Sequence, residues 1–257
     1  MSDEWIIGVD EAGRGPVIGP LVVGALAIRA TDVEELRELG VKDSKDLSVT
    51  ERERIEAEIV SRVTEGRWRS GLVICQPSRI DINSQTSDLN SLEIELFAEA
   101  IEATALSAKA GVIRADACDV DEQRFARRLT SALGENWLDW DVEARHGMDS
   151  SDLAAGGASI LAKVTRDAAI HEISTRTGLD IGSGYPSDLR TRKAVEHLLT
   201  NGKHTTVFAG VGLPSQTSGQ PLTAPQFQCV RRVGAPSCNH HSTTGHREKR
   251  QMPHFGP

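Results

Sequence analysis

The sequence predicts an α/β fold with a mixed sheet, followed by an irregular C-terminal segment. Two apolar runs, at residues 5–10 and 19–28, are joined by a Gly- and Pro-rich connection too short for a helix, so we expect them to pair as antiparallel strands. Further apolar runs alternate with amphipathic stretches, which is typical of strand–helix units with parallel pairing. Beyond residue 203 no helical or strand period is sustained.

The expected elements follow in order along the first 200 residues. Strands are predicted at residues 5–10, 19–28, 69–76, 111–119 and 141–149. Helices are predicted at residues 32–39, 51–63, 91–106, 121–133, 150–174 and 188–200. Thr50 or Ser48 is a suitable N-cap for the second helix, and Ser187 or Asp188 for the last. The helix at 150–174 is expected to be interrupted at Gly156 and Gly157.

Composition and charge exclude several classes of protein. No apolar run reaches the roughly 18 residues that a membrane-spanning helix needs, and the N-terminus, MSDEW, lacks the layout of a signal peptide. We therefore expect a cytoplasmic protein without a membrane partner. We also expect a monomer. The four cysteines are too scattered for a disulfide framework. The net charge of −8 argues against broad electrostatic adhesion to nucleic acid, so such a contact would need a local basic groove.

The C-terminal segment differs from the rest of the chain. Residues 204–257 contain six of the ten prolines and five of the eight histidines. Residues 201–257 carry a net charge of +5, against −13 for residues 1–200. This composition predicts a disordered tail. Its cysteines and histidines match no strong zinc-finger spacing.

Acidic residues end three of the expected strands: Asp10 with Glu11, then Asp116, then Asp149 with Asp152 close by. If these strands are neighbours, four carboxylates converge at one edge of the sheet, where sites gather in α/β proteins. Carboxylates at that density repel one another. Mg²⁺ or Mn²⁺ would relieve the repulsion, because these hard cations prefer oxygen ligands. Two such ions would suit phosphodiester hydrolysis.

The glycine-rich connection after Glu11 has three interpretations. A dinucleotide-binding turn fits poorly, because the spacing is GxGxxxG, prolines interrupt it and a strand follows where a helix should. The connection is then either a plain hairpin link or a nest of backbone N–H groups that a ligand can approach closely.

Five segments taken together resemble the ribonuclease HII family, especially its archaeal form. These are DEAGRGPVIGP, VKDSKDL, ADACDVDEQRFAR, SILAKVTRD and GSGYPSD, and the resemblance covers residues 5 to about 200. It implies a ribonuclease H-like catalytic domain at residues 1–203, with a five-stranded mixed sheet flanked by helices.

The resemblance also implies an activity. Members of this family hydrolyse the RNA strand of RNA–DNA hybrids and cut 5′ of ribonucleotides embedded in duplex DNA, leaving 3′-hydroxyl and 5′-phosphate ends. Catalysis uses Mg²⁺ or Mn²⁺ in a two-metal site. The metal-binding carboxylates fall on Asp10, Glu11, Asp116 and Asp149, with the spacing from His146 favouring Asp149 over Asp152.

Substrate contacts carry over in the same way. The resemblance implies that the loop of Gly13, Arg14 and Gly15 contacts the backbone around the ribonucleotide and its 2′-hydroxyl. Tyr185 would pack on the neighbouring sugar, and the residues meeting phosphates would be Lys45, Ser159 and Lys163. The 2′-hydroxyl is what distinguishes RNA from DNA at one site.

The resemblance stops near residue 203. The family continues with a basic segment ending in tryptophan, whereas this chain reads HTTVFAGVGLP from His204. A shifted reading frame would explain the change, since codons for residues 205–214 can be chosen that encode Arg-Arg-Ser-Trp in another frame. The alternative function is then an RNA–DNA hybrid-binding protein whose catalysis is impaired by the displaced C-terminal segment. A genuine accessory tail is the rival explanation.

Overall fold

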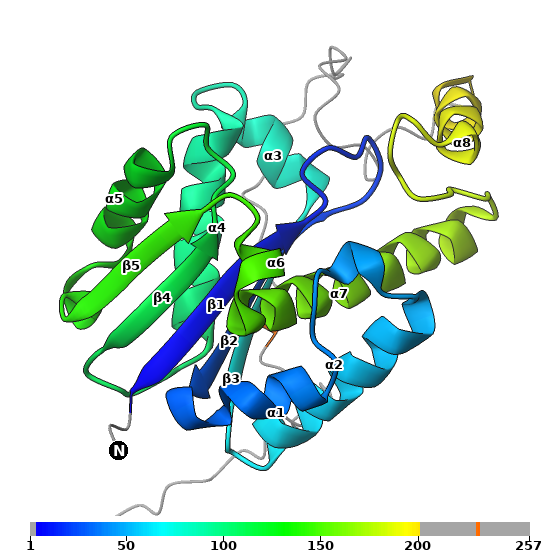
Figure 1. Cartoon of the computed structure of the whole chain (residues 1–257). Helices are drawn as coiled ribbons and strands as arrows, with labels where there is room; N and C mark the ends of the chain where they lie inside the picture. Colours follow the sequence, from blue (N-terminus) through cyan, green and yellow to red (C-terminus); the bar gives the residue numbers. More distant parts are fainter. Residues whose placement is uncertain (1–3, 201–229, 232–257) are drawn as a thin grey trace, which may run out of the picture.

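A computed structural model describes residues 4–200 and 230–231 of the chain. Its sheet has the strand order β5-β4-β1-β2-β3-β6 (Figure 1). The strands are β1 (Trp5–Ala12), β2 (Leu21–Arg29), β3 (Arg69–Cys75), β4 (Gly111–Asp116), β5 (Trp140–Arg145) and β6 (Val230–Arg231). The helices are α1 (Val33–Glu38), α2 (Val49–Thr64), α3 (Pro77–Asn83), α4 (Leu89–Ala103), α5 (Glu122–Leu133), α6 (Met148–Ser151), α7 (Leu153–Thr177) and α8 (Leu189–Thr200).

Strand pairing confirms the predicted mixed sheet. β1 pairs antiparallel with β2, which pairs antiparallel with β3. β4 lies parallel to β1, and β5 lies parallel to β4. The five predicted strands are all present, and the two-residue β6 adds to the β3 edge. The predicted tail at 204–257 otherwise lies outside the described residues.

Helices cover both faces of the sheet (Figure 1). On one face, α4 and α5 pack over a core that includes Ile7, Val9 and Phe97. On the other, α1, α2 and α7 enclose a second core that includes Ile6 and Leu26. This division follows from the alternation of side chains along β1, which sends successive residues to opposite faces.

Close packing of α7 on the sheet depends on small residues. A methyl group placed on Gly8 of β1 would lie 2.0 Å from the backbone of Ala154 in α7, and one on Gly24 of β2 would lie 2.6 Å from the carbonyl oxygen of Ala158. Only glycine allows the helix backbone to come this near. The N-terminal part of α7 therefore lies directly against β1 and β2, next to the acidic end of β1.

Several boundaries differ from the sequence-based predictions, and two of them bear on the site. The strand predicted at 141–149 is β5 only to Arg145, and Asp149 lies on the short helix α6 instead. The helix predicted at 150–174 is not interrupted at its glycine pair; the break falls at Asp152, which has extended backbone angles and caps α7. The glycines stay helical because they are buried in tight packing against neighbours such as Leu26.

Smaller features complete the fold. The helix α3 was not predicted from the sequence, and it begins at Pro77, whose ring suits a first helical turn. Of the two candidate caps of α2, Ser48 forms a capping box with Glu51. In the described part of the chain, no helix is long and apolar enough to cross a membrane.

Candidate metal centre and nucleic-acid interface

The acidic end of β1 presents two carboxylates to opposite faces of the sheet. Asp10 lies on the α7 face, is 4 % exposed and is hydrogen-bonded to Ser159 of α7. Glu11 lies on the α4 face, beside Glu93. Both remain close to the carboxylate of Asp116 at the end of β4: ligand oxygens of the three side chains all lie within 4.8 Å of one another. The parallel pairing of β1 and β4 places these strand ends side by side.

Asp149 joins this cluster from α6, and Asp152 does not. Asp149 is 4 % exposed and its negative charge acts on both Asp10 and Asp116. Asp152 instead accepts hydrogen bonds from the first backbone N–H groups of α7 and pairs with Arg114 at 2.6 Å. The turn that carries Asp149 is tied to β4, since the N–H of Met148 donates to Asp116 at 2.9 Å.

Burial and mutual repulsion make the cluster reluctant to ionise. Burial, and then the charges of Glu11 and Asp116, raise the pKa of Asp10 well above its usual value. Burial, with Asp116 adding to it, raises the pKa of Glu11 to about 7. Burial also raises the pKa of Asp116. Such a group of hard oxygen donors, crowded and short of positive charge, suits a divalent cation such as Mg²⁺ or Mn²⁺.

Lys45 lies beside this cluster and forms an ion pair with it. It lies in the turn after α1, with its ammonium 3.5 Å from Asp149 and 3.9 Å from Asp43. Burial lowers its pKa, but the attraction of Asp149, Asp43 and Asp10 is larger in sum and the pKa is raised. The side chain of Lys45 is 78 % exposed, so it remains accessible to a ligand.

Two further predicted residues lie on α7. Ser159 is buried and shares a hydrogen bond of 3.0 Å with Ser44, besides its bond to Asp10. It therefore links the Lys45 turn to the acidic cluster. Lys163 pairs with Asp167 one turn further along α7, at 2.6 Å. This ion pair lies within the helix and does not involve the four clustered carboxylates.

The glycine loop and the GSGYPSD loop lie against each other. The backbone N–H groups of Val17 and Ile18 donate to the carbonyl oxygen of Gly184, at 2.9 and 3.2 Å. Tyr185 lies opposite Gly15, since a methyl group on that glycine would be 3.7 Å from the tyrosine ring. Gly13 has a φ of +103°, a backbone conformation that favours glycine. The packing thus brings together two loops that are far apart in sequence.

Arg14 is held by a group that the sequence-based analysis did not identify. Its guanidinium lies 3.1 Å from Glu93 and donates to Asn90 at 2.7 Å, both on α4, and to the carbonyl oxygen of Cys118. Glu93 is fully buried; burial, with the charge of Glu11 adding to it, raises its pKa to about 8. Ligand atoms of Glu11, Glu93 and Cys118 form a second close group. A glutamate at helical spacing between Leu89 and Phe97, on the buried stripe, was the available signal.

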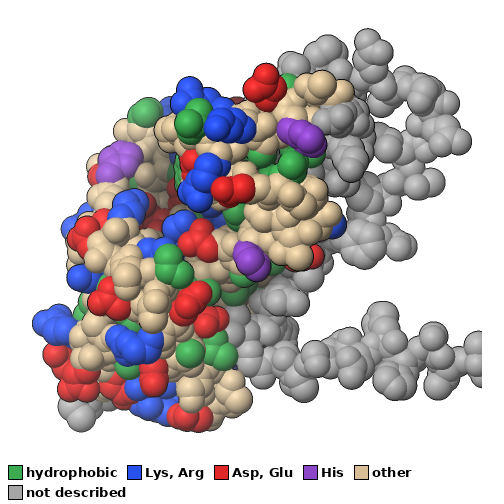
Figure 2. All heavy atoms as spheres, turned by 90° about the vertical axis from the view of Figure 1, so that its right-hand side faces the viewer, with side chains coloured by type: hydrophobic (Ala, Val, Ile, Leu, Met, Phe, Trp, Pro, Cys, Tyr) green, Lys and Arg blue, Asp and Glu red, His purple; other side chains and the backbone are tan. Residues whose placement is uncertain are grey.

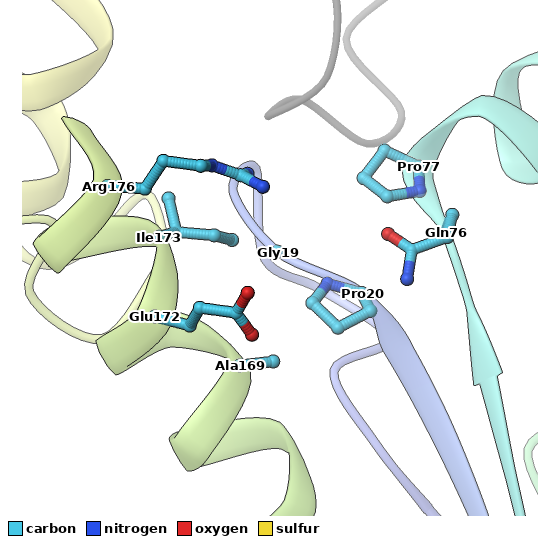
Figure 3. A pocket seen from close by; sticks show the side chains of 8 residues that line it. All are labelled: Gly19, Pro20, Gln76, Pro77, Ala169, Glu172, Ile173 and Arg176. Atoms are coloured by element: carbon cyan, nitrogen blue, oxygen red, sulfur yellow. The ribbon is translucent and has the colours of Figure 1, made fainter. Parts of the chain in front are cut away.

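A small pocket lies beside the glycine loop but includes none of the four clustered carboxylates (Figure 3). Its volume is about 120 Å³, and it opens between the C-terminal half of α7 and the start of α3. Gly19 and Pro20 form its back, while Glu172 and Arg176 project from α7. The acidic cluster is therefore a separate site, at the strand ends.

Charged side chains of both signs are interspersed over the face shown in Figure 2. No single-sign basic surface covers that face, as the negative net charge predicts. Binding of nucleic acid would accordingly depend on a few placed groups near the strand ends.

The fold and the acidic cluster are those of a metal-dependent nuclease with the ribonuclease H-like fold. A family model described as ribonuclease HII matches residues 7–208. The chain belongs to the ribonuclease HII family. It is 43 % identical over 192 residues to ribonuclease HII of Thermococcus kodakarensis, and the aligned region covers 75 % of this chain and 79 % of the relative.

Solved structures agree with this assignment. The chain matches the ribonuclease HII in a complex with PCNA from Archaeoglobus fulgidus with a TM-score of 0.68 and 34 % identity, over 79 % of this chain and 91 % of that one. It matches ribonuclease H2 of Pyrococcus horikoshii with a TM-score of 0.68 and 35 % identity, over 79 % and 92 %. The predicted family and fold are thereby confirmed, including the archaeal character of the resemblance.

Proposed function

We propose that this protein is an endoribonuclease that hydrolyses the RNA strand of RNA–DNA hybrids and cuts 5′ of ribonucleotides embedded in duplex DNA. The observation that carries the proposal is the convergence of four acidic side chains at the strand ends, beside the paired glycine and tyrosine loops. The family assignment supports the same activity. The products would carry 3′-hydroxyl and 5′-phosphate ends.

Asp10, Glu11, Asp116 and Asp149 are the proposed metal-binding and catalytic residues. Burial and mutual repulsion raise the pKa values of three of these carboxylates, and the charge of Asp149 adds to the repulsion. Binding of Mg²⁺ or Mn²⁺ would remove the repulsion that favours bound protons. Two such ions would activate a water molecule and stabilise the leaving oxygen. The backbone bond from Met148 to Asp116 and the serine bond to Asp10 hold two of the carboxylates in place.

The substrate side of the site is proposed at the two loops. Backbone N–H groups around Gly13 and Gly15 would approach the ribonucleotide closely, because neither residue has a side chain to prevent it. Tyr185 would stack on the adjacent sugar. Arg14 is 35 % exposed and is oriented by Glu93, so a phosphate could reach only its open side.

The proposed phosphate contacts come from the other side of the cluster. Lys45 is exposed next to Asp149, and Ser159 lies behind it. Lys163 would have to leave Asp167 to reach a phosphate. All the proposed groups come from one chain, which supports action as a monomer. We propose the cytoplasm as its place of action.

Cleavage of a DNA duplex that contains one ribonucleotide would test the function. The protein would be assayed with Mg²⁺ or Mn²⁺ at several salt concentrations, beside an Asp116→Asn variant and a continuous RNA–DNA hybrid. We expect a cut 5′ of the ribonucleotide that the variant does not make. Binding of the hybrid without any cut, by a folded protein, would instead support the alternative of a binding protein with impaired catalysis.

A further inference from the structure

Arg166 of α7 is a buried cation that the proposed function does not use. Its side chain is 1 % exposed, and its ion pair with Asp167 is long, at 3.9 Å. Its Nη2 donates to the carbonyl oxygen of Ser183 at 3.1 Å, while its Nε has no hydrogen-bond partner among the described residues. A buried charge with so little compensation is costly. Its presence therefore calls for a reason beyond packing.

The guanidinium lies between the two loops proposed to read the ribonucleotide. A methyl group on Gly13 would lie 2.6 Å from Nε of Arg166, and one on Gly184 would lie 2.9 Å from its Nη2. A methyl group on Gly19 would lie 4.0 Å from the same Nη2. All three glycines have positive φ. The backbones of both loops thus fold around one side chain, and a residue with a Cβ at Gly13 or Gly184 would displace it.

Tyr185 completes the arrangement. The centre of the Arg166 guanidinium lies 5.0 Å from the centroid of the tyrosine ring, within the range of a cation–π contact. The ring also lies next to Gly15. Arg166 therefore contacts the tyrosine, the carbonyl of the residue two positions before it and the glycine loop at the same time.

We propose that Arg166 is a positioning residue that sets the place of Tyr185 and of the glycine loop relative to the bound ribonucleotide. This rests on the proposed function of the two loops. Arg166 does not contact the reacting phosphate; it acts through Tyr185. A planar guanidinium suits the task, because it can stack on the ring and donate in its own plane at once, which a lysine ammonium cannot do.

A double-mutant cycle on the full chain would test this inference. Arg166→Met, Tyr185→Ala and the double variant would be compared for kcat/KM on the duplex with one ribonucleotide. Loss of a desolvated cation–π contact predicts a decrease of about tenfold to thirtyfold for Arg166→Met. Because Arg166 acts through Tyr185, the double variant should be no more than about twofold worse than the more impaired single variant.

Matched variants separate positioning from general destabilisation. Arg62→Met removes another stacked arginine, on α2, whose guanidinium lies 5.2 Å from the ring centroid of Trp68, and should leave kcat/KM unchanged. Arg166→Lys keeps the charge and should recover only part of the loss. If Arg166→Met fails to fold, the same cycle is carried out with Arg166→Lys.

The outcomes are distinct. Wild-type kcat/KM in the Arg166 variants, or effects of Arg166 and Tyr185 that multiply independently, would overturn the inference while leaving the proposed nuclease function standing. If the wild-type protein cuts no substrate, the proposed function fails, and the cycle is then measured on hybrid affinity by fluorescence anisotropy. Independent effects on affinity would overturn the inference in that case as well.

Discussion

Asp149 and Asp152 are close in sequence, but the structure predicts opposite consequences for their substitution. Asp149→Asn should abolish cleavage while the protein stays about as stable as the wild type. Asp152→Ala should lower stability while the folded protein still cleaves. The reason is that Asp149 is buried among the other carboxylates, whereas Asp152 caps α7 and pairs with Arg114.

The magnitudes follow from the contacts. Asp152 accepts two N-terminal N–H groups of α7, each at 3.0 Å, and loss of such a cap costs about 1 kcal/mol. Its pair with Arg114 is largely shielded on the aspartate side, at 13 % exposure, and contributes about 1 kcal/mol more. The total of about 2 kcal/mol corresponds to a decrease in Tm of about 4–8 °C. Asp149→Asn loses only an exposed lysine partner, so stability should change by less than about 1 kcal/mol.

Thermal unfolding and single-turnover cleavage, measured on both variants at one metal concentration, would test the crossed prediction. For Asp149→Asn we expect at least a hundredfold lower cleavage rate, since even indirect partners of a metal site contribute about 10–100-fold. For Asp152→Ala we expect a rate within about threefold of the wild type below its Tm. Wild-type cleavage by Asp149→Asn, or loss of cleavage by a folded Asp152→Ala protein, would refute the assignment.

Three other predictions concern the buried Glu93, metal binding and the packing of α7. Burial and the charge of Glu11 raise the pKa of Glu93 to about 8 from 4.5, so the folded state keeps a proton that the unfolded chain releases. Stability should therefore fall as pH rises from 4.5 towards 8. Glu93→Gln should flatten this pH dependence in thermal unfolding, and an unchanged slope would contradict the prediction. At a hundredfold excess over Kd, Mg²⁺ or Mn²⁺ should stabilise the folded wild type by about 2.7 kcal/mol and so raise its Tm. The same metal should raise the Tm of Asp10→Asn much less, and equal shifts in Tm would argue against the carboxylate site. Gly8→Ala should destabilise by at least about 1–3 kcal/mol in chemical denaturation, because its methyl group would lie 2.0 Å from the α7 backbone, and a neutral result would show that α7 can move away.

Local sequence patterns were enough to predict most of the fold. The apolar runs that became β1 and β2 are joined by too few residues for anything but an antiparallel pair, and this pairing was observed. Asp116 ends β4 as predicted, whereas β1 continues two residues beyond Asp10, to Ala12. The short helix α6 was missed, since four residues carry no measurable period.

What the sequence by itself determined was which residue types stand at the ends of strands and in the loops, together with the family to which they belong. The tertiary structure decided which of them meet. Asp149 rather than Asp152 joins the cluster because α6 turns back onto β4 through the bond from Met148. Glu93 holds Arg14, and Arg166 lies under Tyr185, because α4 and α7 pack on opposite faces of the sheet. The direction of a side chain depends on how distant elements pack around it, and no local pattern in the sequence encodes that packing.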